Sequence, residues 1–284
     1  MSQLMQMRQR MKTIETIQKI THAMRLIAMS SHTRLKAKQT TLKEYFKEVD
    51  TLFYNTYQLA PKWEHPVCKI NNQNPELLII IGSQKGLCGN FNTAILQTVK
   101  QLIIQKHTIE CITVGKKTYD FAHAKLNINP ILTFNTFSAG NYLRTAQEII
   151  DYLFNNQERY GKVTVIGSFA KSFFNQVAFA HQLVPIQNKD IVFSTIKKDA
   201  FIWDESPTTI LNQLLKQYLI AQLSVWLFET LIAEQAARFL SMDTSTRNAK
   251  NMLDSTKLLY NKLRQTKITK ELLEFTSAIN AQDF

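Results

Sequence analysis

The sequence predicts an α/β protein with a long coiled coil, in which two helices from the chain termini pair antiparallel and carry a central open α/β domain. Neither Gly nor Pro occurs in Met1–Leu59 or Thr208–Phe284, although these residues usually interrupt helices. All seven Gly lie between Pro61 and Pro185, in a stretch rich in β-branched residues. We therefore expect an N-terminal coiled-coil helix over residues 1–59, a central α/β domain over residues 75–195 and a C-terminal coiled-coil helix over residues 207–284.

Apolar residues recur along the first segment at spacings of three and four, which is the pattern of a coiled-coil seam. The row contains Leu4, Met7, Met11, Ile14, Ile17, Ile20, Met24, Ile27 and Ser31, and then Leu42, Phe46, Val49, Phe53 and Tyr57. The spacing slips between Ile14 and Ile17 and again between Ser31 and Leu35. We therefore expect an irregular supercoil.

The last segment carries a comparable row, so helices from the two ends of the chain can pair antiparallel. Its members are Leu211, Leu215, Tyr218, Gln222, Val225, Phe228, Ile232, Ala236 and Phe239. The most apolar stretch, Tyr218–Ala233, is shorter than the ~20 residues that span a bilayer, and it contains Glu229. This stretch is interpreted as a helix buried on several sides.

The middle of the chain alternates β-branched runs with helical segments, which predicts a Rossmann-like open sheet with right-handed crossovers. The continuous apolar run Leu77–Ile81 is typical of a parallel strand that is buried on both faces. We expect strands at residues 76–82, 109–115, 162–168 and 177–184, and helices at residues 91–106 and 142–154.

The loop after the first expected strand contains Gly82, Gly86 and Gly89, but their spacing fits neither glycine-rich phosphate-binding pattern. We interpret the loop as a tight turn from strand to helix. Cys88 has no neighbouring His or carboxylate that would activate it as a nucleophile, so we expect it to be packed. The three Cys are widely spaced without a C-x-x-C pair, which favours a reducing compartment over a zinc site or a disulfide framework. No catalytic residue, cofactor or metal is predicted.

The net charge of +12 is concentrated in two helical stretches. Residues 8–38 contain eight Lys or Arg against Glu15 alone, and residues 247–270 contain seven against Asp254 alone. An acidic surface is therefore the expected surrounding. Nucleic acid is disfavoured as a partner because these basic residues alternate with a core-type apolar row, whereas a DNA-reading basic helix carries few apolar residues.

Motifs at both ends and in the first central turn resemble the gamma subunit of F-type ATP synthases. They are Gln18–Met24, Gly86–Gly89 with Asn92, Glu234–Arg238, Asn248–Ala249, Tyr260–Lys262, Arg264–Gln265 and Ile268–Leu272. The resemblance implies a central stalk inside a ring of alpha and beta subunits, with its base on the epsilon subunit and the membrane c-ring. It also implies that the chain couples proton-driven rotation to ATP synthesis at the beta subunits, without a substrate or cofactor of its own.

The same resemblance implies a set of residues that contact the beta subunit: Met24, Arg25, Arg238, Arg264, Gln265, Thr269 and Glu271. Arg264 and Gln265 match a pair that hydrogen-bonds to a beta-subunit loop. Met24 and Arg25 match the stretch that faces the lever region of the beta subunit. The alternative for each residue is an ordinary position on a solvated helix face or in the seam between the helices.

Several positions depart from the family pattern. His22 stands where the family usually has Lys, and Gln84 and Lys85 replace an acidic-basic pair. Phe284 would place an aromatic ring at the shaft tip.

We also expect the polar stretch Ser241–Lys250 to face outward. Because neither a transit peptide nor a paired-Cys insertion is evident, a bacterial enzyme is favoured, with the chain peripheral at the cytoplasmic face of the inner membrane.

Two other classes of function remain open from the residues alone. A non-rotary coiled-coil scaffold or adaptor would keep the architecture, but it would not associate with ATPase subunits in a nucleotide-sensitive way. An enzyme would need a pocket with paired carboxylates or a His-centred arrangement at the carboxyl ends of the strands.

Overall fold

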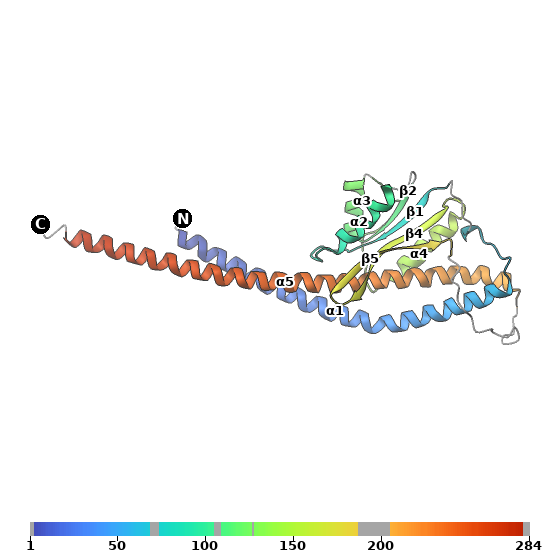
Figure 1. Ribbon diagram of the computed structural model, residues 1–284, viewed down its shortest axis with the longest axis horizontal. Coiled ribbons are helices and arrows are strands. Elements are labelled where there is room, and N and C mark those ends of the chain that lie inside the picture. Colours follow the sequence, from blue (N-terminus) through green and yellow to red (C-terminus); the bar gives the residue numbers. More distant parts are fainter. Residues whose placement is uncertain (1–2, 69–73, 105–108, 127, 187–204, 281–284) are drawn as a thin grey trace. The chain divides into compact units, whose positions relative to one another are not determined.

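The computed structural model describes residues 3–68, 74–104, 109–126, 128–186 and 205–280 (Figure 1). The chain divides into two compact units. Met1–Ile27 and Phe239–Phe284 form the first, here called the terminal unit, and Ala28–Arg238 forms the second, the body unit. Helices α1 (Gln3–Leu59) and α5 (Pro207–Asn280) each contribute to both units. Residues 187–195 of the expected central domain, and Phe284, lie outside the described residues.

The body unit is built on a five-stranded sheet with the order β3-β2-β1-β4-β5. β1 pairs in parallel with β2 and β4, β3 pairs in parallel with β2, and β5 is antiparallel to β4. All four expected strands are present, and the one expected at residues 177–184 is the antiparallel β5. The bounds are β1 Glu76–Ile81, β2 Ile109–Val114, β3 Leu132–Phe134, β4 Lys162–Ser172 and β5 Asn175–Val184.

Helices cover both faces of this sheet, and alternate side chains of β1 divide the core between them. Leu78 and Ile80 pack with residues of α2 and α3, whereas Leu77, Ile79 and Ile81 pack with residues of α4 and α5. Figure 1 shows α2 and α3 on one side of the sheet and α5 on the other. The apolar run of β1 is thus explained by burial on both faces. The bounds are α2 Phe91–Ile104, α3 Lys116–Leu126 and α4 Tyr142–Asn155, with a 3-10 turn at Pro66–Cys68.

α2 and α4 are present as expected, whereas α3 and β3 were not predicted. Residues 105 and 106, at the end of the expected first helix, lie outside the described residues. β3 spans only three residues, too few to show an alternating pattern. α3 is short, and of its residues Thr118 and Ala122 are buried, which leaves no apolar row to detect.

Helix α5 approaches the sheet closely in the body unit, and this approach depends on Gly167 of β4. A Cβ at this position would lie 2.6 Å from Thr230 Oγ1 and 2.8 Å from Phe179 Cζ. Ser168 N donates to the same Thr230 Oγ1 at 3.3 Å. Leu219, Leu223 and other residues of this part of α5 are fully buried. The interpretation of Tyr218–Ala233 as a helix buried on several sides is therefore confirmed.

Inside the body unit, α1 and α5 run in opposite directions. Lys43 Nζ lies 2.6 Å from Glu229 Oε1, and ten residues further along α1 the ring of Phe53 stacks on Tyr218 with centroids 4.6 Å apart. The partner's residue number falls as the α1 number rises, which is the order of an antiparallel pair.

The terminal unit has the same antiparallel order. Ile14 packs in one apolar cluster with Ala249 and Leu253. Thr246 Oγ1 donates to Thr21 Oγ1 at 3.0 Å, and Arg25 Nη1 lies 2.6 Å from Asp243 Oδ1.

The seam expected along α1 is wrong at Ile17, Ile20 and Ile27, whose exposed fractions are 48%, 54% and 66%. Buried and half-buried positions instead continue at spacings of three and four without a slip, because polar side chains occupy three of them, Gln18, Thr21 and Arg25. The row consists of Leu4, Met7, Met11, Ile14, Gln18, Thr21, Arg25 and Ala28. The predicted slip arose from following apolar residues where the inward contacts are hydrogen bonds and an ion pair.

The expectation that Ser241–Lys250 faces outward is also wrong in part. Met242 and Ala249 are buried, and Asp243 and Thr246 bond to α1. Within the described residues, no helix combines the length and the hydropathy needed to cross a membrane.

Candidate partner-contact site

Four of the seven expected contact residues lie exposed near the end of α5: Arg264, Gln265, Thr269 and Glu271. Two of these residues interact with neighbours on the same helix. Glu271 Oε1 lies 3.4 Å from Lys267 Nζ, and Thr269 Oγ1 donates to the Gln265 carbonyl at 3.0 Å. Both interactions are solvent-exposed, so these side chains are sterically available to a partner.

The same part of α5 exposes large apolar side chains. Ile268, Leu272 and Phe275 are 49%, 62% and 67% exposed, and their spacing of four and three places them on one face of the helix. An exposed apolar row beside polar residues is typical of a protein-protein contact surface. This row extends the candidate site beyond the residues named from the sequence.

Arg25 is engaged inside the terminal unit. Its guanidinium pairs with Asp243, which also accepts from Arg247, and the Arg25 and Asp243 side chains are only 28% and 21% exposed. The hydrogen bond from Arg25 is the main cause that lowers the pKa of the Asp243 carboxyl. Met24, next to Arg25, is half-buried. Sequence reasoning missed Asp243, although it is the one acidic residue within Ser241–Lys250.

Arg238 is engaged inside the body unit. It forms an ion pair with Glu234, one turn earlier on α5, and the two side chains are 12% and 7% exposed. Burial raises the pKa of Glu234, and the nearby Arg238 opposes that rise. Arg238 Nη2 also donates to the carbonyl of Lys85 at 3.3 Å, in the loop that follows β1. The partner-contact set thus contains two arginines whose charges are already paired within the chain.

The loop after β1 is a tight turn, held at its two ends by Asn92 from the first turn of α2. Ser83 N donates to Asn92 Oδ1 at 3.1 Å, and Asn92 Nδ2 lies 3.3 Å from Cys88 Sγ. Leu87 has a φ of 64° and is 59% exposed. Cys88 is buried, and burial raises the pKa of its thiol, which disfavours the reactive thiolate.

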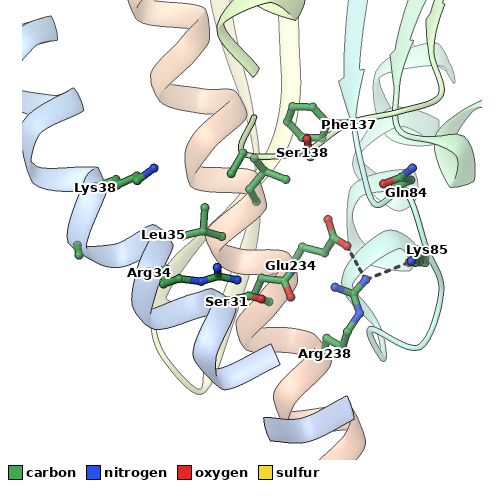
Figure 2. Close-up of a pocket in the computed structure, with 14 residues that line it drawn as sticks. Ser31, Arg34, Leu35, Lys38, Gln84, Lys85, Phe137, Ser138, Glu234 and Arg238 are labelled. Atoms are coloured by element: carbon green, nitrogen blue, oxygen red, sulfur yellow. Dashed lines mark hydrogen bonds and ion pairs between the residues drawn. The ribbon is translucent and has the colours of Figure 1, made fainter. Parts of the chain in front are cut away.

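A cavity of about 580 Å³ opens in the body unit between α1, α5, the loop after β1 and the segment that precedes α4. Figure 2 shows Arg34 and Lys38 on α1, with Gln84 and Lys85 on the loop across from them. The described residues that line the cavity include one carboxylate, Glu234, which Arg238 pairs, and neither His nor Cys. This lining lacks the paired carboxylates or His-centred group that the enzyme alternative requires.

No group of three or more His, Cys, Asp or Glu within the described parts of the chain is arranged to hold a metal ion. Long helices from both ends of the chain flank an α/β sheet, and α5 exposes a row of large apolar side chains near its end, which is typical of a subunit of a larger assembly.

Comparison with known proteins identifies the assembly. A family model described as ATP synthase matches residues 3–281. The chain therefore belongs to the ATP synthase family. The resemblance to the gamma subunit inferred from the terminal motifs is confirmed by similarity to curated ATP synthase gamma chains.

Three such relatives are the gamma chains of Rickettsia typhi, Methylobacterium nodulans and Buchnera aphidicola, which are 28%, 29% and 28% identical. Each alignment covers 99% of this chain, and 99% or 100% of the relative.

Solved structures share the fold. The rotor of the Euglena gracilis mitochondrial ATP synthase matches with a TM-score of 0.65 at 14% identity, over 93% of this chain and 98% of that one. The central stalk and c-ring structure from Tetrahymena thermophila matches with a TM-score of 0.59 at 20% identity, over 79% and 98%.

Proposed function

We propose that this chain is the central rotor shaft of an F-type ATP synthase. It couples proton-driven rotation of the membrane ring to conformational change and ATP synthesis at the catalytic beta subunits. The family match over residues 3–281 carries the proposal, and the exposed end of α5 supplies a surface suited to it. The chain is a non-catalytic subunit, and bond making and breaking belong to its neighbours.

The shaft is an antiparallel coiled coil of α1 and α5. Support comes separately from each unit, where Lys43 pairs with Glu229 and Arg25 pairs with Asp243 in antiparallel order. The inward positions of α1 recur at the spacing of three and four that a coiled coil needs. Such a pair resists bending better than one helix, and a shaft that transmits torque requires stiffness.

Six of the seven residues expected from the sequence contact the beta subunit, in two different ways, and the seventh, Arg238, acts from inside the body unit. Arg264, Gln265, Thr269 and Glu271 are exposed and bind directly, together with the neighbouring apolar row. Met24 and Arg25 present the side of α1 to the lever region, with Arg25 held in place by Asp243.

Coupling follows from differential contact. Each orientation of an asymmetric shaft presents different side chains to chemically identical catalytic sites. Only a difference in contact free energy between the states of a site can bias its equilibrium. The exposed polar residues and the apolar row near the end of α5 lie on the same half of that helix, so one side of the shaft differs from the other and supplies the required asymmetry.

The proposed partners are the alpha and beta subunits of the ring, the epsilon subunit and the membrane c-ring. The solved relatives were determined as rotor or central stalk assemblies, one of them with its c-ring. The relatives with the gamma-chain name come from bacteria, which supports a bacterial enzyme with this chain peripheral at the cytoplasmic face of the inner membrane.

The test is the ATPase activity of a reconstituted alpha/beta ring with and without this chain, measured together with co-elution of the components. A stable complex with stimulated turnover is the expected result. Binding without stimulation would favour the non-rotary scaffold, and absence of binding would contradict both proposals.

A further inference from the structure

We propose that Arg238 is a positioning residue that fixes the loop Gly82–Gly89, rather than a residue that touches the beta subunit itself. This inference rests on the proposed function, and it refines the role given there to Arg238.

The burial of Arg238 is the first argument. Its side chain is 12% exposed, and its charge is paired with Glu234, whose side chain is 7% exposed. Removing one partner of a buried ion pair strongly destabilises a folded protein, because the other charge is left buried without compensation. Little of the Arg238 guanidinium is accessible to a neighbouring subunit. Its pairing with Glu234 instead fixes the direction in which its N–H groups donate hydrogen bonds.

That direction leads to the loop. Arg238 Nη2 donates to the Lys85 carbonyl at 3.3 Å, across 153 residues of sequence. Asn92 holds the loop at Ser83 and Cys88, and Lys85 lies between these two anchors. Arg238 therefore restrains the middle of a loop whose ends are tied by another side chain.

The loop has a conformation that needs such restraint. Leu87 has a φ of 64°, in the left-handed region that disfavours residues with a Cβ, and its side chain is 59% exposed. Strained backbone of this kind persists only where the surroundings hold it, and it is concentrated at functional positions. Lys85 from the same loop lines the cavity opposite Arg34. Fixing the loop thus fixes both an apolar and a basic side chain of this surface.

Cys88 gives a direct measure of the loop conformation. Its thiol is buried beneath the loop, with Sγ 4.0 Å from the Lys85 carbonyl that Arg238 binds. Cys111 in β2 is equally buried, so it reports opening of the whole body unit. Labelling of the full-length chain with N-ethylmaleimide, with each Cys quantified by peptide mass spectrometry, separates loop release from unfolding.

The principal variant is Arg238→Gln. Because it leaves Glu234 buried without its cation, we pair it with the double variant Glu234→Gln/Arg238→Met, which removes both charges and keeps the side-chain volume. The control is Arg144→Met/Glu148→Gln, an exposed pair on α4 with the same spacing of four.

We expect Cys88 to react about tenfold faster in both Arg238 variants, the effect of losing ~1.4 kcal/mol of protection against local opening. Labelling of Cys111 stays at the wild-type rate in the double variant, and the control changes neither rate. An unchanged Cys88 rate in the double variant, or equal acceleration of Cys88 and Cys111, would overturn the inference.

The outcome is independent of the proposed function because labelling uses the chain alone. In the reconstituted complex, the double variant should also lower stimulated ATPase while the complex still co-elutes. If the wild-type chain fails to stimulate the ring, the proposed function fails whatever the labelling shows. If stimulation is normal in a variant whose loop is released, the loop is not part of the coupling and the inference fails.

Discussion

Arg25 of α1 and Asp243 of α5 are 218 residues apart in sequence, and their Nη1 and Oδ1 atoms lie 2.6 Å apart. Arg247 approaches the other oxygen of the same carboxylate. An arginine expected from resemblance to face a neighbouring subunit thus joins the two helices of the terminal unit. Any effect of Arg25 on coupling would therefore be exerted through the packing of those two helices.

This pair predicts a pH-dependent contribution to stability. Because the pKa of Asp243 is lowered from its ordinary value of 3.8, the contribution is complete above that value and is lost as the pH falls through the lowered pKa. Asp243→Asn should lower the thermal midpoint at neutral pH, and the gap from wild type should close in strong acid. Thermal unfolding by circular dichroism across this range is the measurement. Glu271→Gln, in an exposed pair, is the control, and a gap that persists in strong acid would contradict the prediction.

The aromatic contact between the helices of the body unit predicts a large loss of stability. Phe53 is buried and stacks on Tyr218. Phe53→Ala should destabilise the chain by about 3–5 kcal/mol, because it removes the ring and leaves a cavity. Tyr45→Ala, on the same helix at 52% exposure, should change stability by less than about 0.5 kcal/mol. Urea denaturation measures the stability of both variants. Similar losses of stability would show that the contact between Phe53 and Tyr218 stabilises the chain no more than an exposed ring does.

Two glycines, one directly after β2 and one in the loop after β1, provide a matched test of the backbone at the carboxyl ends of these strands. Gly115 has a φ of 97°, and a Cβ there would lie 2.5 Å from the Gly82 carbonyl oxygen. Gly115→Ala should lower the free energy of unfolding by about 1–3 kcal/mol through backbone strain, and the steric clash with the Gly82 carbonyl adds to this loss. A Cβ at Gly86 would meet nothing within 4 Å, so Gly86→Ala should change stability by less than about 1 kcal/mol. Equal midpoints in denaturant for the two variants would refute this account.

The exposed end of α5 predicts a change in coupling without a change in stability. Gln265→Ala should lower ATPase stimulation in the reconstituted complex about two- to tenfold, which corresponds to one lost hydrogen bond of ~0.5–1.5 kcal/mol. The thermal midpoint of the free chain should stay constant because the side chain is exposed. Thr266→Ala, at the adjacent exposed position, should leave stimulation unchanged. Equal effects of the two variants would argue against a specific contact.

The sequence predicted those parts of the fold in which apolar pattern and burial coincide. β1 is the clearest example, because Leu77–Ile81 are buried on both faces of the sheet and all five residues are apolar. The long helices followed from the absence of Gly and Pro. β3 could not be predicted, since three residues on an existing sheet take their conformation from the neighbouring strand β2.

The inward face of α1 was misplaced for a physical reason. Thr21 and Arg25 face α5 because partners for their polar groups exist there, on residues more than 200 positions away. Ile17 and Ile20 were assigned inward by their hydrophobicity and are exposed instead. Such pairings depend on the register of two distant segments, which a local pattern does not contain. The same is true of Arg238, whose acceptor lies on the loop after β1.

Rotation itself tests the central claim most directly. A biotin attached through Phe174→Cys, at the β4–β5 turn where the native side chain is 76% exposed, would carry a visible probe. With the alpha/beta ring immobilised and ATP supplied, the rotor proposal predicts stepwise rotation of the probe in one direction, at a rate that follows ATP turnover. A probe that stays bound but shows no directed rotation while the ring hydrolyses ATP would contradict it.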